Sequence, residues 1–118
     1  MRYQQPPRMS RPEIERELAS GDGERILTAL LSAFYSEDCA WVERRCLQFL
    51  QSSSASARRG AALVLGHLAG AYGDEIDLVG ASEVLTTLSA DADESVRVAA
   101  SDSLVDVLHS LKLQRKLH

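Results

Sequence analysis

The sequence predicts an all-α protein in which about six helices form three stacked hairpins. The first supporting observation is composition, because the 118 residues include 17 Leu and 15 Ala, which both favour helices. The second is that only 5% of the residues are aromatic, fewer than a β-sandwich or barrel needs. The third is a pattern of apolar and capping residues that recurs after about 39 positions and indicates stacked helical units.

The chain is expected to contain one domain. Residues 1–9 include Pro6 and Pro7 and have no apolar residues at helical spacing, so we expect a flexible N-terminal arm. Residues 10–118 are too few for a catalytic domain with a separate binding domain. We therefore expect a single helical-repeat domain after the arm.

The first hairpin follows the arm. Ser10 and Glu13 have the spacing of a capping box, which begins a short helix that ends at Gly21. Asp22 then caps a second helix that extends to about Tyr35. The apolar residues of this second helix recur every three or four positions: Leu27, Leu30, Leu31 and Phe34.

The second hairpin begins with Asp38, which caps a third helix at residues 39–51. Ser54 or Ser56 caps a fourth helix that ends at Gly73, and the serine run before it is too short for an interdomain linker. Each helix has one apolar face: Val42, Cys46, Phe49 and Leu50 on the third, and Ala57, Ala61, Val64, Leu65, Leu68 and Tyr72 on the fourth.

The third hairpin contains a fifth helix at residues 77–89 and a sixth helix that follows a second capping box, formed by Asp91 and Glu94. The basic residues near the end of the sixth helix suit the negative end of the helix dipole. The two apolar faces are Leu78, Val84, Leu85 and Leu88 on the fifth helix, and Val96, Ala100, Ser103, Leu104, Val107 and Leu111 on the sixth.

An internal repeat relates the second and third hairpins. The stretch from Leu47 to Leu65 matches the stretch from Leu85 to Leu104, with an offset of 38 residues before the loop and 39 after it. Each hairpin alone leaves an apolar face uncovered, and stacking the hairpins buries it. The repeat therefore predicts a short α-solenoid.

The segment DADESVRVAA, from Asp91 to Ala100, resembles the HEAT-repeat signature, in which a loop precedes Val-Arg and an alanine-rich second helix. The residues RRGAA at 58–62 resemble the same motif in the preceding repeat. The resemblance covers about residues 39–111 and implies a HEAT-like α-solenoid that binds a partner rather than catalysing a reaction. It also implies that Arg58 and Arg97 are the family's internal arginines, which form hydrogen bonds across repeats.

Two longer stretches, YSEDCAWVERRCLQFL and ARRGAALVLGHLAG, resemble small HEAT-containing immunity proteins encoded with bacterial polymorphic toxins. This resemblance implies an immunity or antitoxin protein that neutralises a toxin domain in the bacterial cytoplasm. An adaptor or assembly factor for a cellular complex would use the same kind of surface and is kept as an alternative. A nucleic-acid-binding HEAT enzyme would need a basic groove with aromatic residues, whereas this chain has Asp102 and Asp106 there.

Charge is strongly segregated along the sequence. The whole chain has a formal net charge of -4. The segment from Asp74 to Asp106 contains nine acidic residues and one basic residue, Arg97, so its net charge is -8 and that of the remainder is +4. We expect this asymmetry to steer a protein partner with a basic surface toward one end of the solenoid. The alternative is a solvated acidic face without a partner. Binding of nucleic acid is not expected, because that requires neutralisation of phosphates.

The candidate binding residues lie on the sixth helix. At 100° per residue Val98, Asp102, Val105 and His109 share one stripe opposite the apolar face, and Asp106 flanks it. Apolar residues surrounded by charge are typical of a recognition surface. This stripe is therefore the predicted contact for the partner.

The corresponding stripe on the fourth helix has two possible roles. It contains Arg59, Leu63, Gly66 and Gly70, whose small residues allow close approach of another backbone. For Leu63, Gly66 and Gly70 we favour packing against neighbouring helices of the stack. Trp41, next to Arg44 and Arg45, is a further candidate for a binding hot spot. The alternative for Trp41 is a partly buried packing role.

No pattern indicates a catalytic, metal or cofactor site. Cys39 and Cys46 are seven residues apart in one helix, about 10 Å along its axis, which is too far for a disulfide. We expect them to be buried thiols, and with His67 they lack zinc-ligand spacing. His67 and His109 have no nucleophile or paired acid nearby in the pattern. No signal peptide and no apolar run of about 20 residues occurs, so we expect a cytoplasmic protein without a membrane segment.

Overall fold

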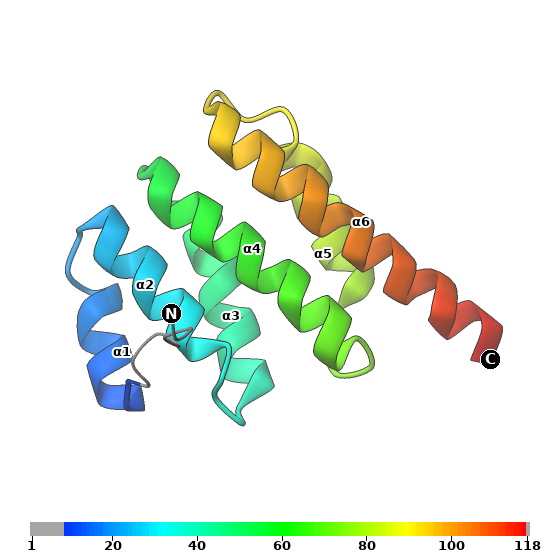
Figure 1. The fold of residues 1–118 in the computed structure, drawn as a ribbon, viewed down its shortest axis with the longest axis horizontal. Coiled ribbons are helices and arrows are strands. Elements are labelled where there is room, and N and C mark those ends of the chain that lie inside the picture. The colour runs from blue at the N-terminus through cyan, green and yellow to red at the C-terminus, as the bar shows by residue number, and fades with distance from the viewer. Residues whose placement is uncertain (1–8, 118) are drawn as a thin grey trace, which may run out of the picture.

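The computed structural model describes residues 9–117, and every regular element in that range is an α-helix (Figure 1). The six helices are α1 (Arg11–Leu18), α2 (Gly23–Ala33), α3 (Cys39–Phe49), α4 (Ala55–Tyr72), α5 (Leu78–Leu88) and α6 (Glu94–Leu117). The predicted all-α class and the number of helices are confirmed. The predicted N-terminal arm lies outside the described residues except for Met9, which packs against the core.

Side-chain caps begin the first five helices; the sequence predicts those of α1 to α4, and the structure adds the cap of α5. In each case a serine or aspartate oxygen accepts a hydrogen bond from a backbone N–H group in the first turn, which satisfies a group that has no partner inside the helix. For α4 the cap is Ser54 and not Ser56, because the Ser54 hydroxyl accepts from the Ala57 N–H group at 3.3 Å. The caps are Ser10, Asp22, Asp38, Ser54 and Asp77.

The predicted capping box of Asp91 and Glu94 is wrong. Asp93 caps α6, because its carboxylate accepts hydrogen bonds from the backbone N–H groups of Ser95 at 2.8 Å and Val96 at 3.2 Å. Asp91 instead forms a salt bridge with Arg58 of the preceding hairpin. A tertiary partner therefore takes the carboxylate that the local pattern assigned to the helix end.

The helices form three hairpins, α1 with α2, α3 with α4, and α5 with α6, and the hairpins stack through their second helices. In Figure 1 α2, α4 and α6 run side by side in the same direction, with α3 and α5 behind them. Among the described residues no Cα atom of α3 lies within 8 Å of α1 or α5. The helix backbones therefore approach closely in the layer of α2, α4 and α6 and lie further apart in the layer of α1, α3 and α5.

Small residues on α4 allow this close stacking. Gly60 lies against Leu27 of α2, and Gly66 lies against Ser103 of α6, with so little space that a Cβ atom at either glycine would meet the neighbour within about 2.5 Å. Ala61, Ala62 and Ala69 of α4 are also buried. The core between the two layers is mainly aliphatic, and its largest fully buried side chains include Leu30, Val42, Leu65, Leu68, Leu85, Val96 and Val107.

Within the described residues no helix is both long enough and apolar enough to cross a membrane.

Candidate protein-binding surface

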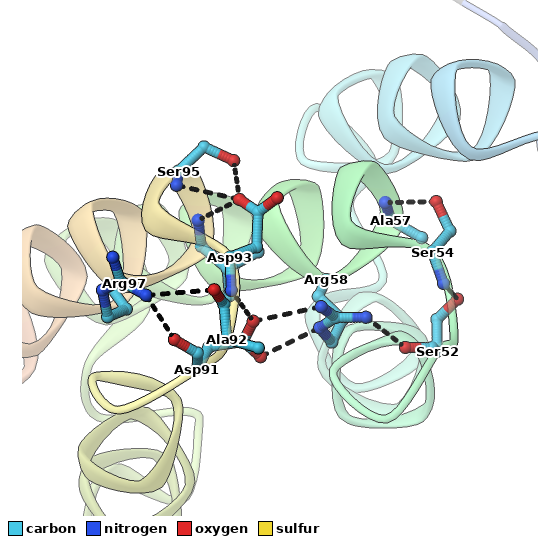
Figure 2. A network of polar contacts seen from close by, with 10 residues as sticks. Ser52, Ser54, Ala57, Arg58, Asp91, Ala92, Asp93, Ser95 and Arg97 are labelled. Atoms are coloured by element: carbon cyan, nitrogen blue, oxygen red, sulfur yellow. Dashed lines mark hydrogen bonds and ion pairs between the residues drawn. The ribbon is translucent and has the colours of Figure 1, made fainter.

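A hydrogen-bonded arginine joins the second and third hairpins (Figure 2). Arg58 donates through Nε and Nη2 to the two carboxylate oxygens of Asp91, both at 3.0 Å, and through Nη1 to the backbone carbonyl of Ser52 at 2.9 Å. Both side chains of the pair are largely buried, with 17% and 11% of their surface exposed. This bidentate pair fixes the loop before α6 and hence the position of α6 on the stack.

Arg97 occupies the equivalent position in the third hairpin, 39 residues after Arg58. It donates to the backbone carbonyls of Asp91 at 2.7 Å and Ala92 at 3.1 Å, as Arg58 does to Ser52. The expected bond across repeats is therefore present for Arg58. Arg97 belongs to the last hairpin and bonds within its own loop.

The predicted stripe on α6 is exposed. Val98 and Val105 have 54% and 65% of their surface exposed, and Asp102, Asp106 and His109 are exposed as well. These side chains are therefore accessible to a partner. Leu108 and Leu113, which the sequence analysis did not include, extend the exposed apolar surface along α6.

Asp106 lies on the side of α6 that faces α4. The residues three before and four after it, Ser103 and Ser110, contact α4: Ser103 lies against Gly66, and the Ser110 hydroxyl donates to the carbonyl of Ala69 at 2.7 Å. Asp102 lies one helical turn before Asp106 on the same side. The two carboxylates therefore stand beside the α4–α6 contact, while Val105 points further into solvent.

An open groove of about 570 Å³ runs across α4 between the end of α2 and the middle of α6. Leu31, Phe34 and Tyr35 line it on the α2 side, and Asp106 lines it on the α6 side. Gly66, His67 and Gly70 of α4 form the remainder of its lining. Two residues of the predicted α4 stripe and Asp106, which flanks the predicted α6 stripe, therefore meet in one groove.

The α2 side of this groove is aromatic. The ring of Phe34 contacts Tyr35 and His67 edge to face, with centroid distances of 5.4 and 5.5 Å, and lies 6.4 Å from the ring of Tyr72. Tyr35 is 51% exposed. Sequence analysis had assigned Phe34 and Tyr72 to packing and gave His67 no role, because the cluster forms only when α2 and α4 are stacked.

Trp41 lies away from this groove. It is only 3% exposed, and its indole Nε1 donates to the carboxylate of Glu15 at 2.7 Å. The same carboxylate accepts from Arg45, and the guanidinium of Arg11 lies 4.3 Å from the centroid of the Trp41 ring. These contacts join α1 to α3, so the geometry supports the packing role of Trp41 over the hot-spot role.

The other α4 residues of the predicted stripe do not line the groove. Arg59 and Leu63 are half-buried, and Leu63 packs against the core. Gly66, which does line the groove, is also buried against Ser103, so the packing alternative holds for it.

Both cysteines are free. The expected burial is confirmed for Cys46, whereas Cys39 is only half-buried. Burial raises the pKa of the Cys46 thiol far above its ordinary value, so this thiol is a poor nucleophile. Within the part of the chain that the structure describes, no group of three or more His, Cys, Asp or Glu side chains is placed to hold a metal ion.

Comparison with solved structures finds a protein of the same shape. A chain in the crystal structure of a CDI complex from Cupriavidus taiwanensis LMG 19424 superposes with a TM-score of 0.74 and is 38% identical. The match covers 91% of the present chain and 95% of the Cupriavidus chain. No protein-family model and no curated protein matches the sequence.

Proposed function

Because the chain belongs to the same family as the Cupriavidus protein found in a CDI complex, we propose that it is an immunity protein that binds and neutralises a toxin domain. CDI, contact-dependent inhibition, pairs a toxin with an immunity protein. The proposed partner is a toxin domain with a basic surface, and the proposed place of binding is the bacterial cytoplasm. In this role the chain is a binding protein without catalytic activity.

The observation that carries the proposal on this chain is the surface of α6. Exposed Val98 and Val105 lie beside the exposed carboxylates of Asp102 and Asp106, within the segment of net charge -8. Apolar contact with charge beside it suits a partner of opposite charge, since complementary charge orients the encounter and excludes wrong partners. His109 lies on the same exposed stripe and belongs to the proposed surface.

We also assign the fold to HEAT-like repeats. The support is that Arg58 and Arg97 occupy equivalent positions and each donates to a backbone carbonyl six residues earlier in its own loop. Repeats that stack through equivalent residues are a feature of α-solenoids.

The test is binding to a candidate CDI toxin domain with a basic surface from the same genome. We expect a stable complex and protection of cells that produce the toxin domain. Reversing both Asp102 and Asp106 to lysine should weaken the affinity by about 100-fold or more at physiological salt, since attraction between opposite charges in the complex becomes repulsion between like charges. Helicity and melting temperature should stay nearly unchanged, because both side chains are exposed.

A matched control reverses Glu75 and Glu83, two exposed acids of the same segment that do not line the groove. The total charge change is identical, so only a local contact on α6 separates the two variants. We expect the control to lose about fivefold or less. Equal losses would contradict the α6 surface, whereas failure of the unaltered chain to bind or protect would contradict the immunity role. Recovery of a housekeeping complex would favour the adaptor alternative.

A further inference from the structure

Nothing in the fold of the free chain requires a glycine at position 70. Gly70 is exposed in the last turn of α4. It does not have a positive φ; among the described residues only Gly21 does. A Cβ atom added at Gly70 would meet nothing within 4 Å. By contrast, Gly60 and Gly66 on the same helix are required because neighbouring helices leave no space for a side chain.

The place where this missing side chain matters is the groove. Gly70 lines it together with Gly66, between the aromatic side formed by Phe34 and Tyr35 and the carboxylate of Asp106. A larger residue at position 70 would fill part of the groove without disturbing the stack. Glycine therefore keeps open a space that the isolated chain does not use.

The lining of the groove suits a cation. Its residues include one carboxylate, Asp106, and no lysine or arginine. The faces of aromatic rings attract cations, and Arg is the residue that most often occupies such a position. The same arrangement exists elsewhere in this chain, where the guanidinium of Arg11 lies over the ring of Trp41.

We propose that one arginine or lysine side chain of the partner enters the groove between α2, α4 and α6, with its charged end at Asp106 and its aliphatic stem along Gly70. Phe34 and Tyr35 then cover the stem and contact the cation from the opposite side. This inference rests on the proposed binding of a basic toxin domain and names the contact that gives it specificity.

The variant that tests it is Gly70→Leu, which fills the groove. Its matched control is Ala71→Leu, which adds a leucine at the next position of the same helix, where the side chain is exposed and does not line the groove. We expect Gly70→Leu to weaken binding of the toxin domain at least tenfold and Ala71→Leu to change it less than twofold. The melting temperature of Gly70→Leu should equal or exceed that of the unaltered chain, because leucine favours helix over glycine. Tyr35→Ala provides a second variant that removes a groove contact without filling the space.

A probe that does not depend on the toxin separates the two proposals. Acetyl-arginine amide should shift the backbone amide signals of Gly66, His67 and Gly70 in an NMR titration. Its uncharged analogue acetyl-citrulline amide should not, and neither compound should shift the signals of Gly66 and His67 in Gly70→Leu. Equal shifts with both compounds, no shifts with arginine, or equal toxin binding by Gly70→Leu and Ala71→Leu would overturn the inference. Arginine-specific shifts without toxin binding would overturn the immunity role alone.

Discussion

The carboxylate of Asp91 receives hydrogen bonds that exist only in the folded chain. Arg58 donates two of them and the backbone N–H group of Asp93 donates a third, at 2.9 Å. The hydrogen bonds from Arg58 and then that from Asp93 hold the pKa of Asp91 below its ordinary value. Folding therefore favours the ionised carboxylate, and protonation of this group opposes folding.

We predict that the Asp91–Arg58 pair makes stability depend on pH in the acidic range. Because the folded pKa is lowered, the contribution is fully present above the unfolded pKa of about 4 and is lost as the pH falls through the folded value. Asp91→Asn should lower the free energy of unfolding at neutral pH by about 2 kcal/mol. Urea denaturation at a series of pH values measures both effects.

Two variants distinguish this pair from a general acid effect. Asp91→Asn should show a smaller loss of stability between neutral pH and pH 3 than the unaltered chain, since its side chain no longer titrates. Glu83→Gln, which removes an exposed carboxylate from α5, should have the pH dependence of the unaltered chain. If Asp91→Asn had the same pH dependence as Glu83→Gln, Asp91 would not be the titrating group.

The local pattern around Asp91 could not reveal this role. Asp91 and Glu94 have the spacing of a capping box, but Asp93 also precedes the helix and is the residue that caps it. The choice depends on Arg58, which is 33 residues away in the sequence and reaches Asp91 only after the hairpins stack. Asp38 also has a distant partner, Arg11, but one of its carboxylate oxygens still accepts from the Trp41 N–H group, so the cap of α3 is retained. The predicted caps of α1 to α4 are confirmed.

At the scale of elements, the α4–α6 contact depends on the absence of a side chain at Gly66. A Cβ atom there would lie 2.5 Å from the hydroxyl oxygen, 2.6 Å from the Cβ atom and 2.9 Å from the Cα atom of Ser103. Rotation of the Ser103 side chain can relieve only the first of these distances. The backbones of α4 and α6 would therefore have to separate.

We predict that Gly66→Ala lowers the free energy of unfolding by about 2 kcal/mol, the usual cost of an added carbon in a closely packed contact. Gly70→Ala is the matched control, because it is the same substitution one turn later, at a position with open space. It should leave stability unchanged or raise it by up to about 1 kcal/mol. Denaturant titration of both variants checks this, and equal effects would contradict the close α4–α6 approach.

The sequence pattern predicted the elements better than the groove between them. Periodicity placed Gly66 and Gly70 on one stripe of α4, and it placed Asp102 and Asp106 near the exposed stripe of α6. It could not show that Gly66 is buried against Ser103 while Gly70 faces open space. That difference depends on how far α6 extends over α4, which no spacing within one helix records.

At the scale of the whole molecule, charge is distributed unevenly along the stack. The segment from Asp74 to Asp106 has a net charge of -8 and the remainder has +4. This segment contains α5 and the first half of α6, so the negative field is centred on the last hairpin, at one end of the row of helices in Figure 1. A basic partner that approaches from any direction is drawn toward this end before contact.

We predict that salt slows association with the toxin domain more than it speeds dissociation. Raising the ionic strength from about 0.01 M to 0.15 M shortens the screening length from about 30 Å to 8 Å, so the field of the last hairpin no longer reaches an approaching partner. The association rate constant should fall about tenfold, while the dissociation rate changes little because the contacts at Asp106 exclude solvent. Stopped-flow and surface-based kinetics measure the two rates.

The control with reversed Glu75 and Glu83 should reduce the association rate alone, whereas reversal of Asp102 and Asp106 should also raise the dissociation rate. An association rate that does not depend on salt would mean that the uneven charge serves no steering role.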